Sequence, residues 1–140
     1  MPAPHVEIRF AGTHAGFAEG FARLHAALDV EGLEGAARYN TELVFEEIIA
    51  NIVKHGAHNG REPDVCVTLQ VLADSIVLGF SDDGLPFDPR GRADPVMPRS
   101  LAEAKIGGFG LLLVRHATSS LDYARTADDR NRLTAVVPRG

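Results

Sequence analysis

Apolar and polar residues alternate most clearly in the run Val-Glu-Ile-Arg-Phe near the start of the chain. This alternation predicts a strand over residues 5–10 whose apolar members face a core. Four further segments are rich in strand-forming residues: 64–72, 75–81, 121–125 and 132–137. Only Ala73 and Asp74 separate the first two of these, so we expect them to form an antiparallel hairpin.

Helical spacing replaces alternation in three other segments. Residues 14–28 carry apolar side chains three or four positions apart, and Thr13 just before them is suited to cap a helix. Two more helices are expected over 36–54, which Gly56 ends, and over about 109–119. The residues expected to form the buried face of the first helix are Phe17, Phe21, Leu24 and Leu28.

The order of these elements predicts an α/β (α+β) fold in a single domain over residues 1–140. A mixed, mostly antiparallel sheet would be covered on one face by helices, as a two-layer sandwich. Residues 83–106 contain four prolines, two glycines and three arginines, so we expect a long loop there. Loops of this length in compact domains are usually functional or disordered.

Composition narrows the choice of function without naming one. The 140 residues suit one domain, and 45% hydrophobic and 24% charged residues are the usual balance of a globular protein. Neither a secretory signal nor an apolar run long enough to span a bilayer is visible. With a single cysteine, Cys66, and a net charge of −5, we expect a cytoplasmic protein that binds neither nucleic acid nor membrane.

The second predicted helix carries a polar stripe. At about 100° per residue, Glu47, Asn51 and His55 fall on one side of it with Lys54 beside them. A solvated helix face would explain such a stripe, but asparagine is a mediocre residue inside a helix. The amide oxygen of Asn51 is suited to ligate Mg²⁺, which prefers oxygen ligands and keeps phosphates in its shell.

A turn follows the strand predicted over residues 75–81. Gly84 would permit a backbone path closed to other residues, leaving Asp82 at the end of the strand. A carboxylate there can accept a hydrogen bond from the exocyclic amine of adenine and would repel the carbonyl of guanine. An ordinary β-turn explains Asp83 and Gly84, but it does not explain the Leu-Pro-Phe-Asp-Pro string that follows.

Glycines at 107, 108 and 110 precede the third predicted helix. Such a hinge lets backbone N–H groups approach phosphate at a helix N-terminus. The glycines could instead simply end the long loop. Their spacing matches neither the Rossmann fingerprint nor the phosphate loop of P-loop enzymes.

Taken in order, segments 47–55, 82–89 and 107–111 resemble the N, G1 and G2 boxes of the GHKL (Bergerat-fold) ATPases. The resemblance implies that ATP and Mg²⁺ are bound, with Asn51 as the metal ligand. It implies that Lys54 approaches phosphate and that His55 lies near the nucleotide. It also implies that Glu47 positions or deprotonates an attacking hydroxyl group.

The same resemblance assigns roles outside the N box. Asp82 and Gly84 would read adenine, and Phe87 would shield the adenine pocket or the core beneath it. Thr134, in the last strand, would lie under the adenine and support Asp82 by a hydrogen bond, unless it is an ordinary strand residue. Residues 83–106 would form an ATP lid. The hinge residues implied to bind the nucleotide are Gly108, Phe109, Gly110 and Leu111, and Lys105 is the candidate phosphate contact because it adjoins the hinge.

The resemblance extends over about residues 6–137, nearly the whole chain. Within the superfamily, the chain looks like the stand-alone branch of bacterial anti-sigma-factor serine/threonine protein kinases. Members of that branch, often homodimers, sequester a sigma factor and phosphorylate a small anti-anti-sigma antagonist. Two alternatives remain. One is a non-catalytic, ATP-gated protein-binding switch, and the other is the ATPase fragment of a larger signalling protein.

Overall fold

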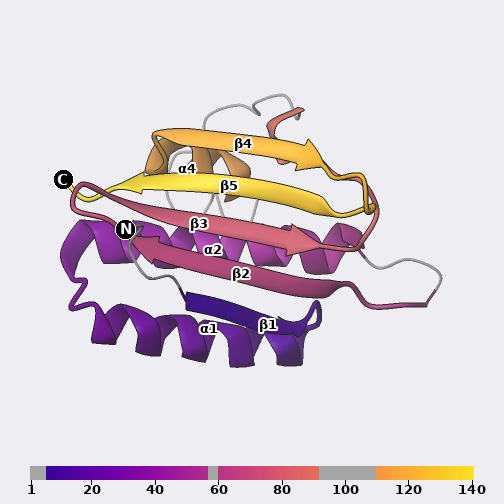
Figure 1. Ribbon diagram of the computed structural model, residues 1–140, viewed down its shortest axis with the longest axis horizontal. Coiled ribbons are helices and arrows are strands. Elements are labelled where there is room, and N and C mark those ends of the chain that lie inside the picture. The colour runs from indigo at the N-terminus through magenta and orange to yellow at the C-terminus, as the bar shows by residue number, and fades with distance from the viewer. Residues whose placement is uncertain (1–5, 57–59, 92–109) are drawn as a thin grey trace.

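A five-stranded sheet with helices on one side forms the molecule (Figure 1). The structure is a computed structural model that describes residues 6–56, 60–91 and 110–140. The strands lie in the order β1-β2-β3-β5-β4, and each neighbouring pair is antiparallel. Their bounds are β1 Val6–Ala11, β2 Asp64–Val71, β3 Ser75–Asp82, β4 Ser120–Arg125 and β5 Asn131–Pro138.

The helical layer consists of α1 (His14–Val30), α2 (Gly35–Gly56) and α4 (Gly110–Ala117). Thr13 caps α1, because its hydroxyl oxygen accepts a hydrogen bond of 2.9 Å from the N–H of Gly16. In Figure 1, α1 lies beside β1, whereas α2 and α4 lie behind the middle and the β4 edge of the sheet. A short 3₁₀ helix, η1 (Pro89–Gly91), follows the end of β3.

The core fills the space between the two layers. Phe45 of α2 is fully buried, and its ring centroid lies 6.0–6.3 Å from the rings of Phe10, Phe17, Phe21 and Phe80. Side chains alternate along a strand, so each strand sends every second residue into this core. The residues of β3 and β5 on the core side are Ile76, Leu78, Phe80 and Asp82 and, facing them, Asn131, Leu133, Ala135 and Val137.

The same alternation therefore carries one carboxylate and one amide into the helix-facing side of the sheet. Asp82 is the last residue of β3 and Asn131 the first residue of β5, and the two are direct partners in the antiparallel register. Both are buried, with exposed fractions of 4% and 6%. Two buried polar side chains at one end of an otherwise apolar layer indicate that the functional site lies at that end.

The predicted fold class is confirmed, and the predicted strands and helices fall within one or two residues of those in the structure. The sheet is antiparallel at every described pairing, where a mixed, mostly antiparallel sheet was predicted. Of the predicted loop, residues 83–91 form a turn and η1, and the remainder lies outside the described residues. Within the described ranges, no helix combines the length and apolar character needed to cross a membrane.

Candidate functional site

A small cavity lies between the C-terminal half of α2 and the adjoining ends of β3 and β5. Its volume is about 30 Å³, room for roughly one or two water molecules. Most of its wall is apolar, including Ile48, Ile52, Phe80 and Leu133. The polar side chains that reach it are Asn51, His55, Asp82, Tyr123 and Asn131.

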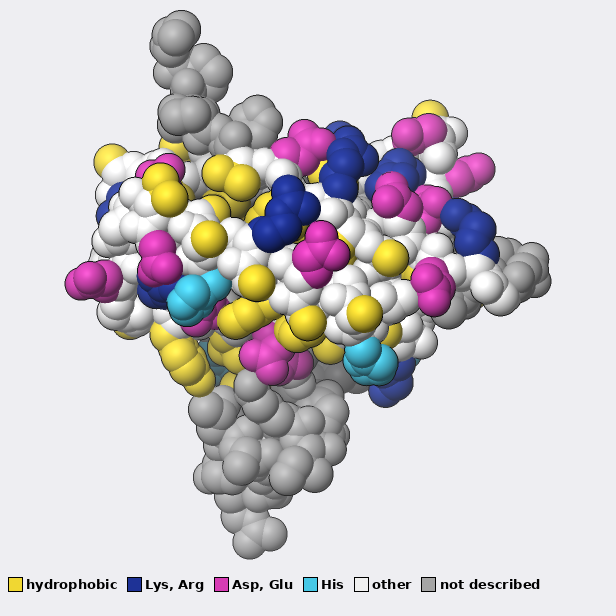
Figure 2. All heavy atoms as spheres, turned by 90° about the horizontal axis from the view of Figure 1, so that it is seen from below, with side chains coloured by type: hydrophobic (Ala, Val, Ile, Leu, Met, Phe, Trp, Pro, Cys, Tyr) yellow, Lys and Arg dark blue, Asp and Glu magenta, His cyan; other side chains and the backbone are white. Residues whose placement is uncertain are grey.

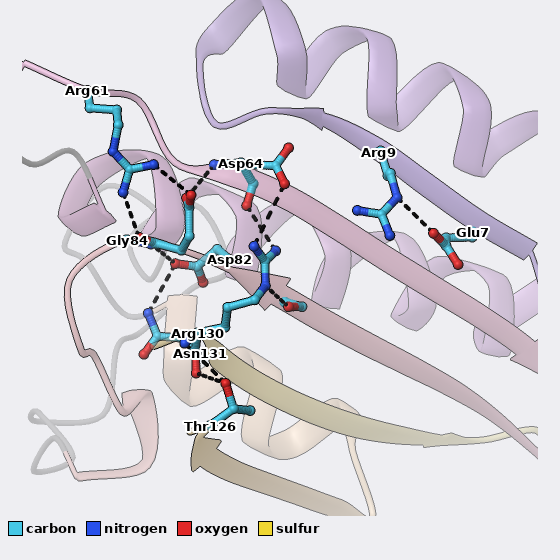
Figure 3. Close-up of polar contacts among 11 residues, drawn as sticks. Glu7, Arg9, Arg61, Asp64, Asp82, Gly84, Thr126, Arg130 and Asn131 are labelled. Carbon is cyan, nitrogen blue, oxygen red and sulfur yellow. Dashed lines mark hydrogen bonds and ion pairs between the residues drawn. The ribbon is translucent and has the colours of Figure 1, made fainter. Parts of the chain in front are cut away.

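Asp82 presents a buried carboxylate to this cavity. Its Oδ1 accepts hydrogen bonds from the N–H of Gly84 at 2.9 Å and from Nδ2 of Asn131 at 3.0 Å (Figure 3). Within the described residues, no hydrogen bond to Oδ2 is found. Burial raises the pKa of Asp82 above its ordinary value, although the bonds from Asn131 and Gly84 oppose the rise.

Asp83, the next residue, is held in a different environment. Its Oδ2 pairs with Arg61 at 2.6 Å, and its Oδ1 accepts the N–H of Asp64 at 2.7 Å. Burial alone would raise the pKa of Asp83, but the bonds from Arg61 and Asp64 outweigh burial and hold it below its ordinary value. Asp83 therefore fastens the turn to the start of β2, and Asp82 is left to face the cavity.

Gly84 is required for space and not for the unusual backbone path that was predicted. Among the described glycines, Gly32, Gly35 and Gly60 have a positive φ, and Gly84 does not. A Cβ at Gly84 would instead lie 2.7 Å from the Cα and 2.8 Å from the carbonyl oxygen of Gly56. A glycine is needed because the turn packs directly on the last residue of α2.

Asn131 is the residue of this site that the sequence did not reveal. Its Nδ2 donates to Asp82 and also to the carbonyl oxygen of Leu85 at 2.8 Å. Its Oδ1 accepts the N–H of Phe87 at 3.2 Å and the hydroxyl of Tyr123. The amide thus joins β3, β4, β5 and the turn after β3.

The predicted support of Asp82 by Thr134 is wrong. Thr134 is paired with Gly79 and lies on the outer face of the sheet, in a groove that it shares with Cys66, because side chains alternate along β5. Asn131, three residues earlier, lies on the opposite face and takes that place. Knowledge of the register between β3 and β5, which pairs Asp82 with Asn131, would have identified this residue.

Two of the residues that line the cavity carry stacked aromatic rings. The imidazole of His55 stacks on the ring of Phe87, with centroids 4.3 Å apart and 12° between the ring planes. Both residues line the cavity, and their predicted closeness to a nucleotide stays a prediction.

Asn51 and Glu47 lie one helical turn apart on α2. The Nδ2 of Asn51 donates to the backbone carbonyl of Glu47 at 2.9 Å, which turns its Oδ1 the other way. The carboxylate of Glu47 lies against the first residue of α4: an added Cβ on Gly110 would be 2.0 Å from Glu47 Oε2. The structure therefore brings together the polar stripe of α2 and the end of the glycine hinge.

Lys54 lies apart from this group. It lines a groove of about 490 Å³ with His14, Phe17 and Glu46, between α1 and α2. Figure 2 shows the side of the molecule on which α1 lies, where hydrophobic side chains reach the surface among acidic ones. The predicted approach of Lys54 to phosphate thus has no support from its position, because Lys54 lines this groove and not the cavity that holds Asp82.

Some of the remaining residues predicted to bind the nucleotide lie within the described residues, and others do not. Leu111 is part of α4 and packs on the core. Lys105, Gly108 and Phe109 lie outside the described residues, as does most of the predicted lid. Within the described part of that lid, Arg90 is engaged by Asp88, whose Oδ2 lies 2.9 Å from the guanidinium.

Comparisons with known proteins match the chain to a family model and to named relatives. The family model described as "Histidine kinase-like ATPase domain" matches residues 13–137. The serine/threonine-protein kinase BtrW of Bordetella bronchiseptica is 35% identical over 97 residues, which cover 69% of this chain and 68% of that protein. The serine-protein kinase RsbW of Listeria innocua is 27% identical over 97 residues, 62% of each chain.

The fold also has a counterpart among solved structures. A chain in the crystal structure of the SiaB–SiaC complex from Pseudomonas aeruginosa superposes with a TM-score of 0.60. The match covers 95% of this chain and 89% of that chain, at 15% sequence identity. At that identity the likeness concerns the fold alone.

The contact between Glu47 and Gly110 predicts a measurable coupling. In Gly110→Ala, the new methyl group would meet the carboxylate at the far end of the flexible Glu47 side chain, which must move aside, so we expect a cost of about 1 kcal/mol, at the low end for overpacking. Glu47→Ala in the same chain removes the obstacle, so the free energies of unfolding of the two variants should be non-additive by about 0.5–1 kcal/mol. Urea denaturation of the parent, both single variants and the double variant measures this coupling.

The neighbouring residue supplies the control. Glu46 lies on α2 but lines the groove beside α1, so Glu46→Ala and Gly110→Ala should be additive. Additive free energies for the Glu47 pair would show that the two residues are not in contact.

Proposed function

The chain belongs to the histidine kinase-like ATPase domain family, and we propose that it is an ATP-dependent serine/threonine protein kinase that acts as an anti-sigma factor. In a partner-switching pathway it would bind a sigma factor and phosphorylate a small anti-anti-sigma antagonist. The kinase names of BtrW and RsbW support the activity. The observation that carries the proposal is the buried carboxylate of Asp82, which lines the cavity and has both of its described hydrogen bonds on Oδ1.

Asp82 would select adenine. Its Oδ1 is already occupied by two donors, so Oδ2 is available to accept a hydrogen bond from the exocyclic amine of the base. The carbonyl of guanine would place an acceptor against the same oxygen. Leaving a buried acceptor unpaired costs about 1–3 kcal/mol, which is enough for a useful preference for ATP over GTP.

Asn51 would hold the magnesium ion. Donation by Nδ2 to the carbonyl of Glu47 fixes which end of the amide faces outward, and that end is the oxygen, the atom type that Mg²⁺ prefers. The glycine hinge before α4 would contact the phosphates through backbone N–H groups, with Lys105, two positions before Gly107 in the sequence, as the candidate cation. When bound, Mg-ATP supplies the phosphoryl group.

Glu47 would act on the acceptor protein. It lies one turn before Asn51 and beside the start of α4, so a hydroxyl that approaches the phosphates also approaches this carboxylate. There it would orient the serine or threonine hydroxyl of the antagonist and accept its proton. A non-catalytic switch is the second candidate, because packing against Gly110 restricts access to the same carboxylate.

Asp82→Asn should abolish ATP binding without weakening the fold. The new amide oxygen keeps the bonds from Gly84 and Asn131, but an NH₂ group now opposes the amine of adenine. The raised pKa of Asp82 means that its ionised form destabilises the folded protein above that pKa, and the neutral amide lacks this cost. Calorimetry with Mg-ATP should therefore show lost binding, and urea denaturation at pH 7 should show equal or greater stability.

Asp83→Asn is the matched control, with the opposite sign. The lowered pKa of Asp83 means that its ionised form stabilises the folded protein at neutral pH, and that this stability disappears as the pH falls below about 4. The variant should be less stable than the parent at pH 7 and should still bind ATP. ATP binding by Asp82→Asn at parental affinity would reject the assignment of the adenine site.

Asn51→Ala should uncouple nucleotide affinity from magnesium. The parent should bind ATP more tightly as Mg²⁺ is added, whereas the variant should show little response, because the ligand oxygen is gone. Asn40→Ala is the control, since Asn40 lies on α2 roughly three turns earlier. If magnesium titration gives the same curve for Asn51→Ala and the parent, Asn51 is an ordinary helix residue.

Glu47→Gln should separate binding from catalysis and tests the kinase itself. Asp82 and Asn51 are unchanged, so ATP should still bind. Loss of a general base typically lowers the rate by a factor of about 10² to 10⁴. The measurement is phosphate transfer to a serine-containing antagonist at saturating Mg-ATP. No transfer by the parent, with ATP bound, would favour the non-catalytic switch.

A further inference from the structure

Asn131 uses its whole hydrogen-bonding capacity inside the site. Burying an amide is costly unless its groups are paired, and here Nδ2 donates twice and Oδ1 accepts twice. The partners come from three separate places: Asp82 at the end of β3, Tyr123 on β4, and the backbone of Leu85 and Phe87 in the turn. A single side chain therefore fixes the carboxylate and the turn that frames the cavity.

Few other side chains could make these four bonds. A hydroxyl group has one proton to donate, so serine or threonine could serve either Asp82 or the carbonyl of Leu85 but not both. A carboxylate donates none, and leucine has the shape of asparagine without its polar atoms. The requirement for two donors and an acceptor on a short side chain selects an amide at position 131.

We propose that Asn131 is the positioning residue that sets the base preference of this site for 6-aminopurines. It keeps Asp82 Oδ1 occupied and holds the turn at residues 84–87 in place, so that Oδ2 alone meets the base. This inference rests on the proposed nucleotide site and adds a residue that acts through Asp82. Arg125 secures the same turn from a second point, since its guanidinium donates to the carbonyl of Gly84 at 2.9 Å.

Without Asn131, the carboxylate would lose its fixed orientation. Oδ1 would retain only the N–H of Gly84, and the group could rotate about the Cβ–Cγ bond. The turn would lose its bonds at Leu85 and Phe87 together. Affinity that depends on the amine of the base should then fall more than affinity that depends on the phosphates.

The test compares two nucleotides that differ only at this amine. ATP and purine riboside triphosphate share ring, sugar and phosphates, and the second has hydrogen in place of the amine. A hydrogen bond to a carboxylate corresponds to roughly a 10-fold preference or more, so the parent should prefer ATP by about that factor. In Asn131→Leu the ratio of the two dissociation constants should fall close to one, and in Asn131→Thr it should lie between.

Matched substitutions at Asn40 control for the change in chemistry. Asn40→Leu and Asn40→Thr alter the same residue type on α2, away from the cavity, and should keep the parental ratio. A purely structural role for Asn131 would weaken both nucleotides equally and leave the ratio unchanged, which would overturn the proposal. Retention of the full ratio by Asn131→Thr would overturn the requirement for two donors.

Two further measurements separate the role of Asn131 from misfolding and from failure of the proposed nucleotide site. If the Asn131 variants do not fold, Tyr123→Phe removes only the hydroxyl that orients the amide, and it should lower the ratio while keeping the fold. An unchanged ratio in Tyr123→Phe would then reject the role of Asn131. Absence of ATP binding by the parent would reject the proposed nucleotide site itself, and the role of Asn131 with it.

Discussion

The buried hydrogen bond between Asn131 and Asp82 is the interaction on which the rest of the site depends. It joins the end of β3 to the start of β5, and both residues lie on the helix-facing side of the sheet. Their position is set by the core, because Phe80 pairs with Leu133 and Leu78 with Ala135 in the same register. A slip of one residue would turn the whole apolar set of β5 outward, so burial of these residues fixes the polar pair.

The sequence predicted the elements well because their periods are local. Helix α2 was recognised over nearly its whole length, and Asp82 was correctly placed at the end of β3. The partner of Asp82 was missed because it lies 49 positions away, and its identity depends on the register between β3 and β5. Thr134 was preferred on resemblance, although the alternation of β5 puts it on the outer face.

The polar stripe of α2 shows a second limit of local reasoning. The helical period placed Glu47, Asn51 and His55 on one side, and the structure keeps Asn51 and His55 at the cavity. The contacts of each side chain are decided by packing against other elements, which the helical period does not predict. Packing of α4 brings Gly110 against Glu47, and packing of α1 places Lys54 in a different groove.

The stacked rings of Phe87 and His55 can rearrange without disturbing the amide of Asn131. Phe87 is tied to Asn131 through its backbone N–H, whereas its ring stacks on His55. The ring can therefore turn about its side-chain bonds while the backbone stays bound to the amide. An aromatic pair contributes about 0.5–1.5 kcal/mol beyond its buried area, compared with about 8 kcal/mol for a ligand of micromolar affinity. Loss of this stack would thus be a small cost, and it would leave the hydrogen bond between Asn131 and Asp82 unchanged.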